Sequence, residues 1–314
     1  MDIKLKNNIS DISHNYYKYL LNLPNVNGIG VGYKIINSFN TKEICLNVFV
    51  DKKIDIKYLS KNIIIPKEYM GIKTDVIKVG QPNFHSGEIF PGKFRPLEGG
   101  CSISVGDNQG EGTIGCIAVK KSFLFFNDYF ILSNNHVLAG VNKIPIGTSI
   151  LQPSEGLSGQ FPEDIVANLT TFVPIKFIEN NNDNINYVDC AIAKIKKNNL
   201  ISKKILEIGQ ITGISKATLG SNVKKVGFIT GLTEGNVIAT NVTSKLPFEN
   251  KFSIFQEQIR ANLFNLSGDS GSIVLNDKNE AVGLLMGGPK DGSNVIFNDI
   301  SLVLKYLNID IFMP

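Results

Sequence analysis

Gly268-Asp269-Ser270-Gly271-Ser272 is the stretch of this 314-residue chain that decides how the rest is interpreted. A serine hydroxyl is a poor nucleophile until a neutral imidazole accepts its proton. Flanking glycines let the backbone curl so that two amides can point at one developing oxyanion. The same residue types also form ordinary polar turns between strands, so the motif by itself leaves both readings open. The choice depends on whether the chain supplies a base.

His136, in Leu132-Ser133-Asn134-Asn135-His136-Val137-Leu138-Ala139, is the base that the sequence offers. It is the only histidine after His85, so its pairing with Ser270 is nearly forced. Taken alone, a histidine in this position could be a loop residue that merely follows a strand. The pairing with a glycine-flanked serine favours a catalytic role for both.

Asp189 is the carboxylate that we expect to hold the imidazole in the required tautomer. It opens the alternating apolar run Asp189-Cys190-Ala191-Ile192-Ala193-Lys194-Ile195, which predicts a strand. Asp183 is the reserve candidate, although it lies in a polar stretch with no strand behind it. Cys190 neighbours Asp189 but points to the opposite face of a strand, so it is predicted to be a core residue rather than a thiol nucleophile.

The order His136, Asp189, Ser270 excludes two other hydrolase classes. The motif also begins as Gly-x-Ser-x-Gly, the nucleophile elbow of α/β-hydrolases, but that fold needs its histidine after the serine. No histidine follows residue 270. A subtilisin-like order needs an Asp before the histidine and a helical α/β pattern, whereas the flanking sequence is typical of strands.

From Gly99-Gly100-Cys101-Ser102-Ile103-Ser104 to the C-terminus, about residues 97–314, the chain resembles the chymotrypsin-like (trypsin-fold) serine peptidases. The resemblance is to their bacterial and plant intracellular branch rather than to digestive trypsins. It implies that Ser270 is the nucleophile, His136 the general base and Asp189 its orienting carboxylate. It also implies that the amides of Gly268 and Ser270 form the oxyanion hole. The chain departs from the secreted enzymes at Asn135-His136-Val137, where the Ala-Ala-His-Cys box and its disulfide are lacking.

The same resemblance implies a substrate pocket. Its base corresponds to Phe264, six residues before Ser270, and its walls to Met286, Gly287 and Gly288. No acidic residue occupies the base, which argues against a preference for Arg or Lys. The bulk of Phe264 favours a shallow pocket.

Composition limits the remaining classes. The hydrophobic share of 43% and charged share of 19% are those of a globular chain, and 29 glycines with 12 prolines are typical of a turn-rich β protein. The net charge of +4 comes from lysines scattered along the chain, so we expect no nucleic-acid partner. The charged N-terminus has no signal-like apolar region, and no run approaches the roughly 20 apolar residues of a membrane span. We therefore expect a cytoplasmic protein with no membrane partner, no cofactor and no metal site.

Four cysteines lack any metal or redox spacing and are predicted to be free core thiols. A cross-strand bridge between Cys101 and Cys116 is left open.

The predicted fold class is mostly β. Two antiparallel six-stranded barrels of chymotrypsin type, with a closing helix capped by Asp299, follow a small α/β domain. The predicted division is residues 1–80 for the α/β domain, 81–96 for a linker, 97–200 for the first barrel and 201–314 for the second. A helix is expected from Asp11 to Leu23, and a hairpin from Phe123–Phe126 through a turn at Asn127-Asp128 to Tyr129–Leu132. The glycine-rich run 28–36 is predicted to be a strand packed closely against a helix, not a phosphate loop.

The function predicted from these observations is that of a serine endopeptidase acting on a protein or peptide. A single dedicated protein target is an open alternative. Two other hypotheses are a catalytically silent protease-fold scaffold, and an interaction protein that works through residues 1–80. That segment is expected to be integral to the body or to dock a partner. If it is instead an inhibitory segment, Lys93 and Arg95 are its candidate cleavage sites.

Overall fold

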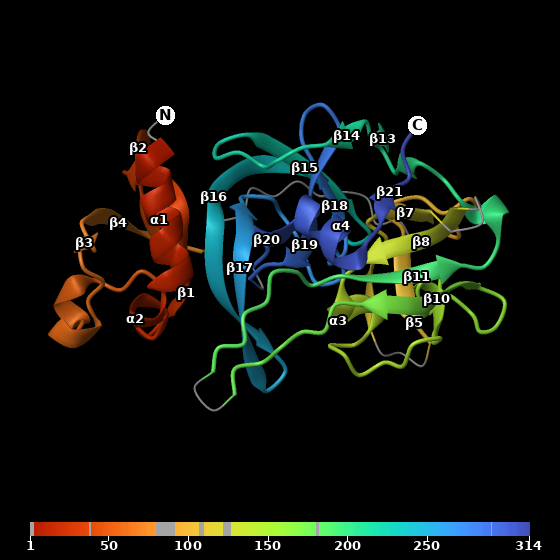
Figure 1. Cartoon of the computed structure of the whole chain (residues 1–314), viewed down its shortest axis with the longest axis horizontal. Coiled ribbons are helices and arrows are strands. Elements are labelled where there is room, and N and C mark those ends of the chain that lie inside the picture. Colours follow the sequence, from red (N-terminus) through yellow and green to blue (C-terminus); the bar gives the residue numbers. More distant parts are fainter. Residues whose placement is uncertain are drawn as a thin grey trace.

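The computed structural model describes residues 3–37, 39–79, 92–106, 110–121, 127–179, 182–289 and 291–314. Strands dominate these residues, and the two longest helices, α1 and α4, lie near the two ends of the chain (Figure 1). The predicted fold class, two β-barrels with a C-terminal helix, is confirmed.

The second barrel is a closed ring of six strands in the order β15-β18-β19-β20-β17-β16, and it closes where β16 pairs back with β15. Its members are β15 (Asn222–Gly227), β16 (Gly231–Phe248), β17 (Lys251–Ala261), β18 (Ile273–Leu275), β19 (Glu280–Gly287) and β20 (Val295–Asp299). Alternating apolar residues such as Val274, Val282 and Phe297 fill the interior. The short β14 (Gly213–Ile214) runs parallel to β19. Barrel closure pairs the strand edges and so leaves few free backbone groups.

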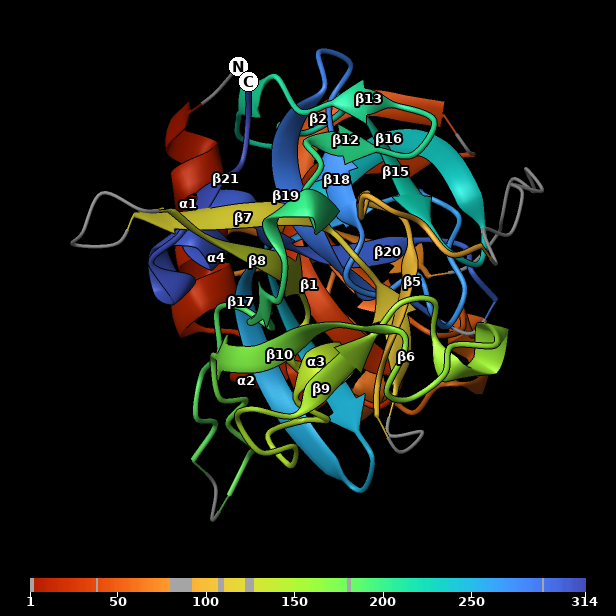
Figure 2. The ribbon, with the colours of Figure 1, turned by 90° about the vertical axis from the view of Figure 1, so that its right-hand side faces the viewer.

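The first barrel has the strand order β21-β7-β8-β11-β10-β9-β5-β6. Its members are β5 (Ser102–Val105), β6 (Glu111–Thr113), β7 (Cys116–Lys121), β8 (Asn127–Ser133), β9 (Ser149–Leu151), β10 (Ile165–Phe172), β11 (Ala191–Ile195) and β21 (Asp310–Ile311). The C-terminal β21 pairs with β7, so the end of the chain returns to the first barrel (Figure 2). One-turn helices η3 (Glu155–Leu157) and η4 (Asn198–Leu200) and the hairpin β12 (Lys204–Ile205)–β13 (Gly209–Gln210) lie in the connections.

Helix α4 (Ile300–Leu307) closes the second barrel as expected. The side chain of Asp299 accepts hydrogen bonds from the backbone N–H groups of Ser301 at 2.8 Å and Leu302 at 3.3 Å, which satisfies two free donors of the first turn. Val303, Leu304 and Leu307 enter an apolar cluster that also contains residues of both barrels. The helix therefore helps to hold the barrels together.

The predicted turn at Asn127-Asp128 is wrong. Both residues belong to β8, where they pair with Lys121 and Lys120 of β7. The segment Phe123–Phe126 lies outside the described residues. The error arose because two adjacent turn-forming residues outweighed a strand that continues through them.

Residues 3–79 form α1 (Ile3–Asn15), α2 (Lys18–Leu21), β1 (Val26–Ile36), β2 (Phe39–Val50), η1 (Ile56–Tyr58), η2 (Lys61–Ile63), β3 (Glu68–Tyr69) and β4 (Ile72–Lys78). The predicted single helix from Asp11 to Leu23 is wrong. The first helix begins earlier and ends at Asn15, and a break at Tyr16-Tyr17 buries Tyr17 instead of Tyr16. Regular helical spacing would have kept Tyr16 on the apolar face with Ile12.

The N-terminal strands continue the sheet of the second barrel. Strand β1 pairs antiparallel with β16, from Gly28 opposite Ser244 to Gly32 opposite Ala239. A Cβ on Gly30 would lie 2.7 Å from Val242 Cγ2, so the run is a strand as expected, but the close approach at this glycine is to strand β16 and not to a helix. The predicted domain boundaries stay predictions, because residues 80–91 lie outside the described part.

Helix α1 is fastened to the same region of the barrel. Ser13 Oγ donates to the carbonyl of Asn241 at 2.9 Å, and Gln256 Nε2 donates to the carbonyl of His14 at 2.9 Å. His14 Nε2 lies 2.8 Å from Glu257 Oε1. The hydrogen bond to Glu257 raises the pKa of His14 above its usual value, and burial opposes this rise only in part.

Candidate active site

His136 lies on α3 (Asn135–Leu138), a single helical turn that directly follows β8. Strand β8 lies between β7 and β11, so the start of this turn is held by the barrel wall. The side chain of His136 is 22% exposed, which leaves one edge of the ring accessible.

Asp189 contacts His136 through both carboxylate oxygens. His136 Nδ1 lies 2.5 Å from Asp189 Oδ2, and the backbone N–H of His136 donates to Oδ1 at 3.2 Å. The carboxylate is fully buried. A buried carboxylate on Nδ1 fixes the tautomer in which Nε2 is free to accept a proton.

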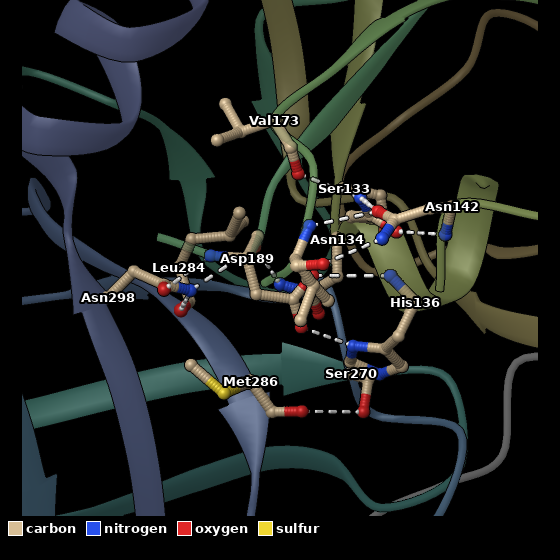
Figure 3. Close-up of polar contacts among 12 residues, drawn as sticks. Ser133, Asn134, His136, Asn142, Val173, Asp189, Ser270, Leu284, Met286 and Asn298 are labelled. Carbon is tan, nitrogen blue, oxygen red and sulfur yellow. Dashed lines mark hydrogen bonds and ion pairs between the residues drawn. The ribbon is translucent and has the colours of Figure 1, made fainter. Parts of the chain in front are cut away.

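Two asparagines hold the backbone of Asp189. Its N–H donates to Asn298 Oδ1 at 2.9 Å, and its carbonyl accepts from Asn134 Nδ2 at 2.8 Å. Asn298 lies on β20 of the second barrel, while Asn134 precedes α3 of the first (Figure 3). The orientation of the carboxylate thus depends on both barrels.

The side chain of Ser270 and the imidazole of His136 overlap in the view of Figure 3. Gly112 of β6 lies between the two segments, since a Cβ there would be 2.5 Å from Val137 Cγ1 and 3.0 Å from the Ser270 carbonyl oxygen. The Ser270 hydroxyl donates to the Met286 carbonyl at 2.9 Å. In the described part of the chain it makes no hydrogen bond to His136.

The turn around Ser270 requires its two glycines. Gly268 has φ +109°, and a Cβ there would lie 2.7 Å from Ile229 Cγ1. Gly271 has φ +94°, and a Cβ there would lie 2.1 Å from Ser133 Oγ. Both positions combine a left-handed backbone with a close approach that only glycine permits.

The backbone N–H groups of Gly268 and Ser270 donate no hydrogen bond to any described residue. Thr113 of β6 fixes the carbonyls of the same turn instead. Its Oγ1 donates to the Gly268 carbonyl and its N–H to the Ser270 carbonyl, each at 2.8 Å. Holding the carbonyls leaves two amides available as a pair of donors for an anionic oxygen.

A buried ion pair holds the residue that precedes Ser270. Lys225 Nζ lies 2.9 Å from Asp269 Oδ2, and both side chains are fully buried. The same carboxylate accepts from the Thr230 hydroxyl at 2.6 Å and from the backbone N–H of Leu266 at 3.0 Å. Burial lowers the pKa of Lys225, and the charge of Asp269 opposes that shift.

Comparisons with known proteins identify the fold. Neither the known family profiles nor the curated proteins contain a match to the sequence. Among solved structures, protease A of Thermobifida fusca matches 69% of this chain and 99% of its own, with 18% identity and a TM-score of 0.50. A chymotrypsin of Cellulomonas bogoriensis covers the same shares at 19% identity and a TM-score of 0.47, and a Nocardiopsis protease matches 68% of this chain and 98% of its own at 17% identity and 0.48. The chain has the fold of the chymotrypsin-like serine proteases.

On this chymotrypsin fold, the residues predicted to form the substrate pocket lie on adjoining segments. A Cβ on Gly292 would lie 2.5 Å from the ring of Phe264, so this ring packs directly against the backbone of the facing segment. A Cβ on Gly287 would come within 3.9 Å of Ser270 Oγ. Gly288 is exposed, whereas Met286 is buried and contributes its carbonyl. Of the four residues, Met286 and Gly287 therefore lie beside Ser270, while Phe264 packs on Gly292.

Neither Asp183, the reserve carboxylate, nor the thiol of Cys190 is suited to a catalytic role. Asp183 accepts a hydrogen bond from Tyr17 and lies 3.2 Å from Lys18 Nζ, so it anchors the N-terminal helices. Cys190 is buried, and burial raises the pKa of its thiol well above the usual value, which disfavours the thiolate. All four cysteines are free, so the bridge between Cys101 and Cys116 is absent.

Sequence reasoning missed the residues that support the site. Lys225 carried a signal: Lys224-Lys225 within a strand means that one lysine must point inward. Asn298 and Thr113 carried none, because their partners are 109 and 155 residues away. Within the described ranges, no cluster of His, Cys, Asp and Glu could hold a metal ion, and no helix is long and apolar enough to span a membrane.

Proposed function

We propose that this protein is a serine endopeptidase in which Ser270, His136 and Asp189 act as a catalytic triad. One observation carries the proposal: a buried carboxylate contacts Nδ1 of His136 at 2.5 Å, and the segment of His136 adjoins the Ser270 turn across Gly112. The backbone N–H groups of Gly268 and Ser270 in that turn have no acceptor among the described residues. No other arrangement of these groups uses all of them.

The reaction follows from these positions. His136 Nε2 accepts the Ser270 proton while Oγ bonds to the substrate carbonyl carbon, and the N–H groups of Gly268 and Ser270 stabilise the oxyanion. The imidazolium then protonates the leaving amine, and the peptide bond breaks to give an acyl-enzyme. A water molecule, deprotonated by the same imidazole, hydrolyses the ester and restores Ser270.

The Ser270 hydroxyl must first leave the Met286 carbonyl, to which it donates at 2.9 Å. A rotation about its χ1 angle redirects the hydroxyl toward His136. Hydrogen bonds of this kind are often absent in unliganded enzymes and form when substrate binds.

The substrate preference that fits the site is a small, uncharged side chain on the amino side of the cleaved bond. The Phe264 ring packs on Gly292 at the position of the pocket base, and it supplies no counter-charge. A shallow apolar base accommodates a small side chain and excludes a long cationic one.

The intact chain is proposed to be active without cleavage. Asp269, next to Ser270, already pairs with Lys225 in the uncleaved chain, so the turn needs no cleavage to gain its counter-charge. Lys93 forms an ion pair with Asp164, and the Arg95 guanidinium donates to the Gln152 carbonyl at 2.8 Å. Both candidate cleavage sites are thus held against the first barrel. A cytoplasmic location and a single dedicated target stay predictions.

The alternative of a catalytically silent scaffold is favoured by one observation, the hydroxyl of Ser270 donating to Met286 rather than to His136. A fluorophosphonate probe separates the two hypotheses, because it labels only a serine activated by its base. We expect labelling of the intact chain and none of Ser270→Ala, with kcat on a cleaved peptide lower by about 10⁶. An intact, folded chain that does not react with the probe would establish the scaffold.

A further inference from the structure

Exposed large apolar side chains are concentrated in the N-terminal part of the molecule. Of the 17 such side chains among the described residues, 10 lie within residues 3–79, and the much longer remainder has 7. Single exposed apolar residues are ordinary on protein surfaces, but a concentration of them indicates a contact surface. The catalytic proposal does not use this surface.

Residues 51–67, here called the projecting loop, carry the most exposed group. Ile54, Ile56 and Tyr58 are 49%, 59% and 75% exposed and lie within five residues of one another. The one-turn helices η1 and η2 shape the loop, and Ile65 packs against the apolar cluster below α1. In Figure 1 this segment, drawn in orange, forms the extreme end of the longest axis, away from the barrels.

Positive charge is concentrated in the same part of the chain. Residues 1–79 contain 12 lysines and 7 acidic residues, a net charge of +5, so the rest of the chain has −1 of the total of +4. Five of the lysines lie in the projecting loop, at positions 52, 53, 57, 61 and 67. Lys57 pairs with Asp55 at 3.1 Å, while the other four form no ion pair with a described residue.

We propose that the projecting loop attaches the protein peripherally to an anionic lipid bilayer. Isoleucine and tyrosine side chains at a convex tip can enter the headgroup region, where the tyrosine hydroxyl stays hydrated. Interspersed lysines then lie at the level of the lipid phosphates and carboxylates, and each adds attraction to an anionic surface. The early expectation of no membrane partner rested on the lack of a spanning segment, which does not bear on attachment by a loop.

The shape of the loop favours a bilayer over a protein partner. Energetically important protein contacts are usually apolar anchors in well-packed, desolvated pockets. The described cavity of about 410 Å³ nearest the N-terminal strands is lined by residues such as Tyr33, Phe49 and Ile238, and by no residue of the projecting loop. The loop instead presents exposed apolar side chains with lysines close to them in the sequence. Attachment there would leave α3, which lies away from the projecting loop in Figure 1, on the aqueous side.

Co-sedimentation with vesicles tests the proposal on the full chain. We expect binding to vesicles of phosphatidylcholine mixed with phosphatidylserine, weaker binding to phosphatidylcholine alone, and loss of binding as salt screens the charges. The variant Ile54→Ser/Ile56→Ser/Tyr58→Ser should not sediment with either. Lys52→Gln/Lys53→Gln should bind more weakly by about fivefold per lysine, which corresponds to about 1 kcal/mol each.

The matched control is Ile146→Ser/Phe161→Ser, which removes two equally exposed apolar side chains from the first barrel. It should bind vesicles like the unaltered chain. All substitutions are at the surface, and fluorophosphonate labelling of each variant should be unchanged, so this test and the catalytic proposal fail separately. The proposal would be overturned if the unaltered chain did not bind the anionic vesicles, or if the triple variant bound them as well as the control does. Either result would leave a protein as the partner of this surface.

Discussion

The buried pair Lys225–Asp269 gives the sharpest prediction about the site. In Lys225→Met the cation is replaced by an apolar side chain of similar length, while the Asp269 carboxylate stays fully buried. Asp269 keeps donors from Thr230 and from the backbone of Leu266, Ile229 and Thr230, but it loses its counter-charge. Breaking a buried pair on one side typically costs about 3–5 kcal/mol. We expect a loss of that size in the free energy of unfolding.

Chemical denaturation measures the free energy of unfolding. The rate of fluorophosphonate labelling, under conditions in which the variant is folded, measures the reactivity of Ser270 and so reports on the position of its turn. The labelling rate should fall by at least tenfold, because the carboxylate that fixes Leu266 and the following turn is displaced. Lys224→Met, on the neighbouring and partly exposed position, is the control and should change neither quantity. Lys225→Met/Asp269→Asn leaves no charge buried and should recover part of the stability. A cost below about 1 kcal/mol, or full-rate labelling of a destabilised variant, would refute the view that this pair positions the turn.

Three further predictions follow from other contacts. Phe264→Ala should raise kcat/KM for peptides with a large apolar side chain before the cleaved bond by about tenfold or more, relative to alanine at that position, as measured on a peptide series; unchanged ratios would mean that Phe264 does not form the pocket base. Asn298→Leu should cost about 1–3 kcal/mol of unfolding free energy and slow labelling of Ser270, because it leaves the buried N–H of Asp189 without its acceptor; a neutral outcome in both assays would contradict that role. The His14–Glu257 pair should make the packing of α1 on the second barrel pH-dependent. Because the pKa of His14 is raised, the stability that the pair contributes is lost as pH rises through that raised value. Because the pKa of Glu257 is lowered, the same contribution is lost on the acid side as pH falls through the lowered value. Hydrogen exchange of the α1 amides, corrected for the intrinsic effect of pH on exchange, should therefore give a free energy of opening that is larger at about pH 6 than at about pH 9, by about 1 kcal/mol or less. His14→Gln should remove this difference.

The candidate triad could be predicted from the sequence because its chemistry restricts the choice. Only one histidine follows residue 85, so any activated serine in the barrels must use His136. The order of His136, Asp189 and Ser270 then excluded folds that need a different order. Strands such as the one after Asp189 were predictable for a similar reason, since period-two alternation is a local property that requires no partner to be known. Their arrangement in two barrels was what the resemblance implied. The prediction of one helix over residues 11–23 was wrong because the burial of Tyr17, a tertiary contact, interrupts the helical spacing of apolar residues.

The support of the site was decided by tertiary structure alone. Asn298 and Thr113 reach their partners over 109 and 155 residues, and nothing local distinguishes them from other polar residues on strands. The pairing of β1 with β16 could not be predicted for the same reason. Side-chain alternation shows which face of a strand is buried, but the hydrogen bonds at the strand's edge are made by the backbone and do not depend on side-chain identity. The sequence by itself thus determined which groups are proposed to react. Their distances, the buried cation under the turn and the attachment of residues 3–79 to the second barrel arise only when the folded backbone brings distant segments together.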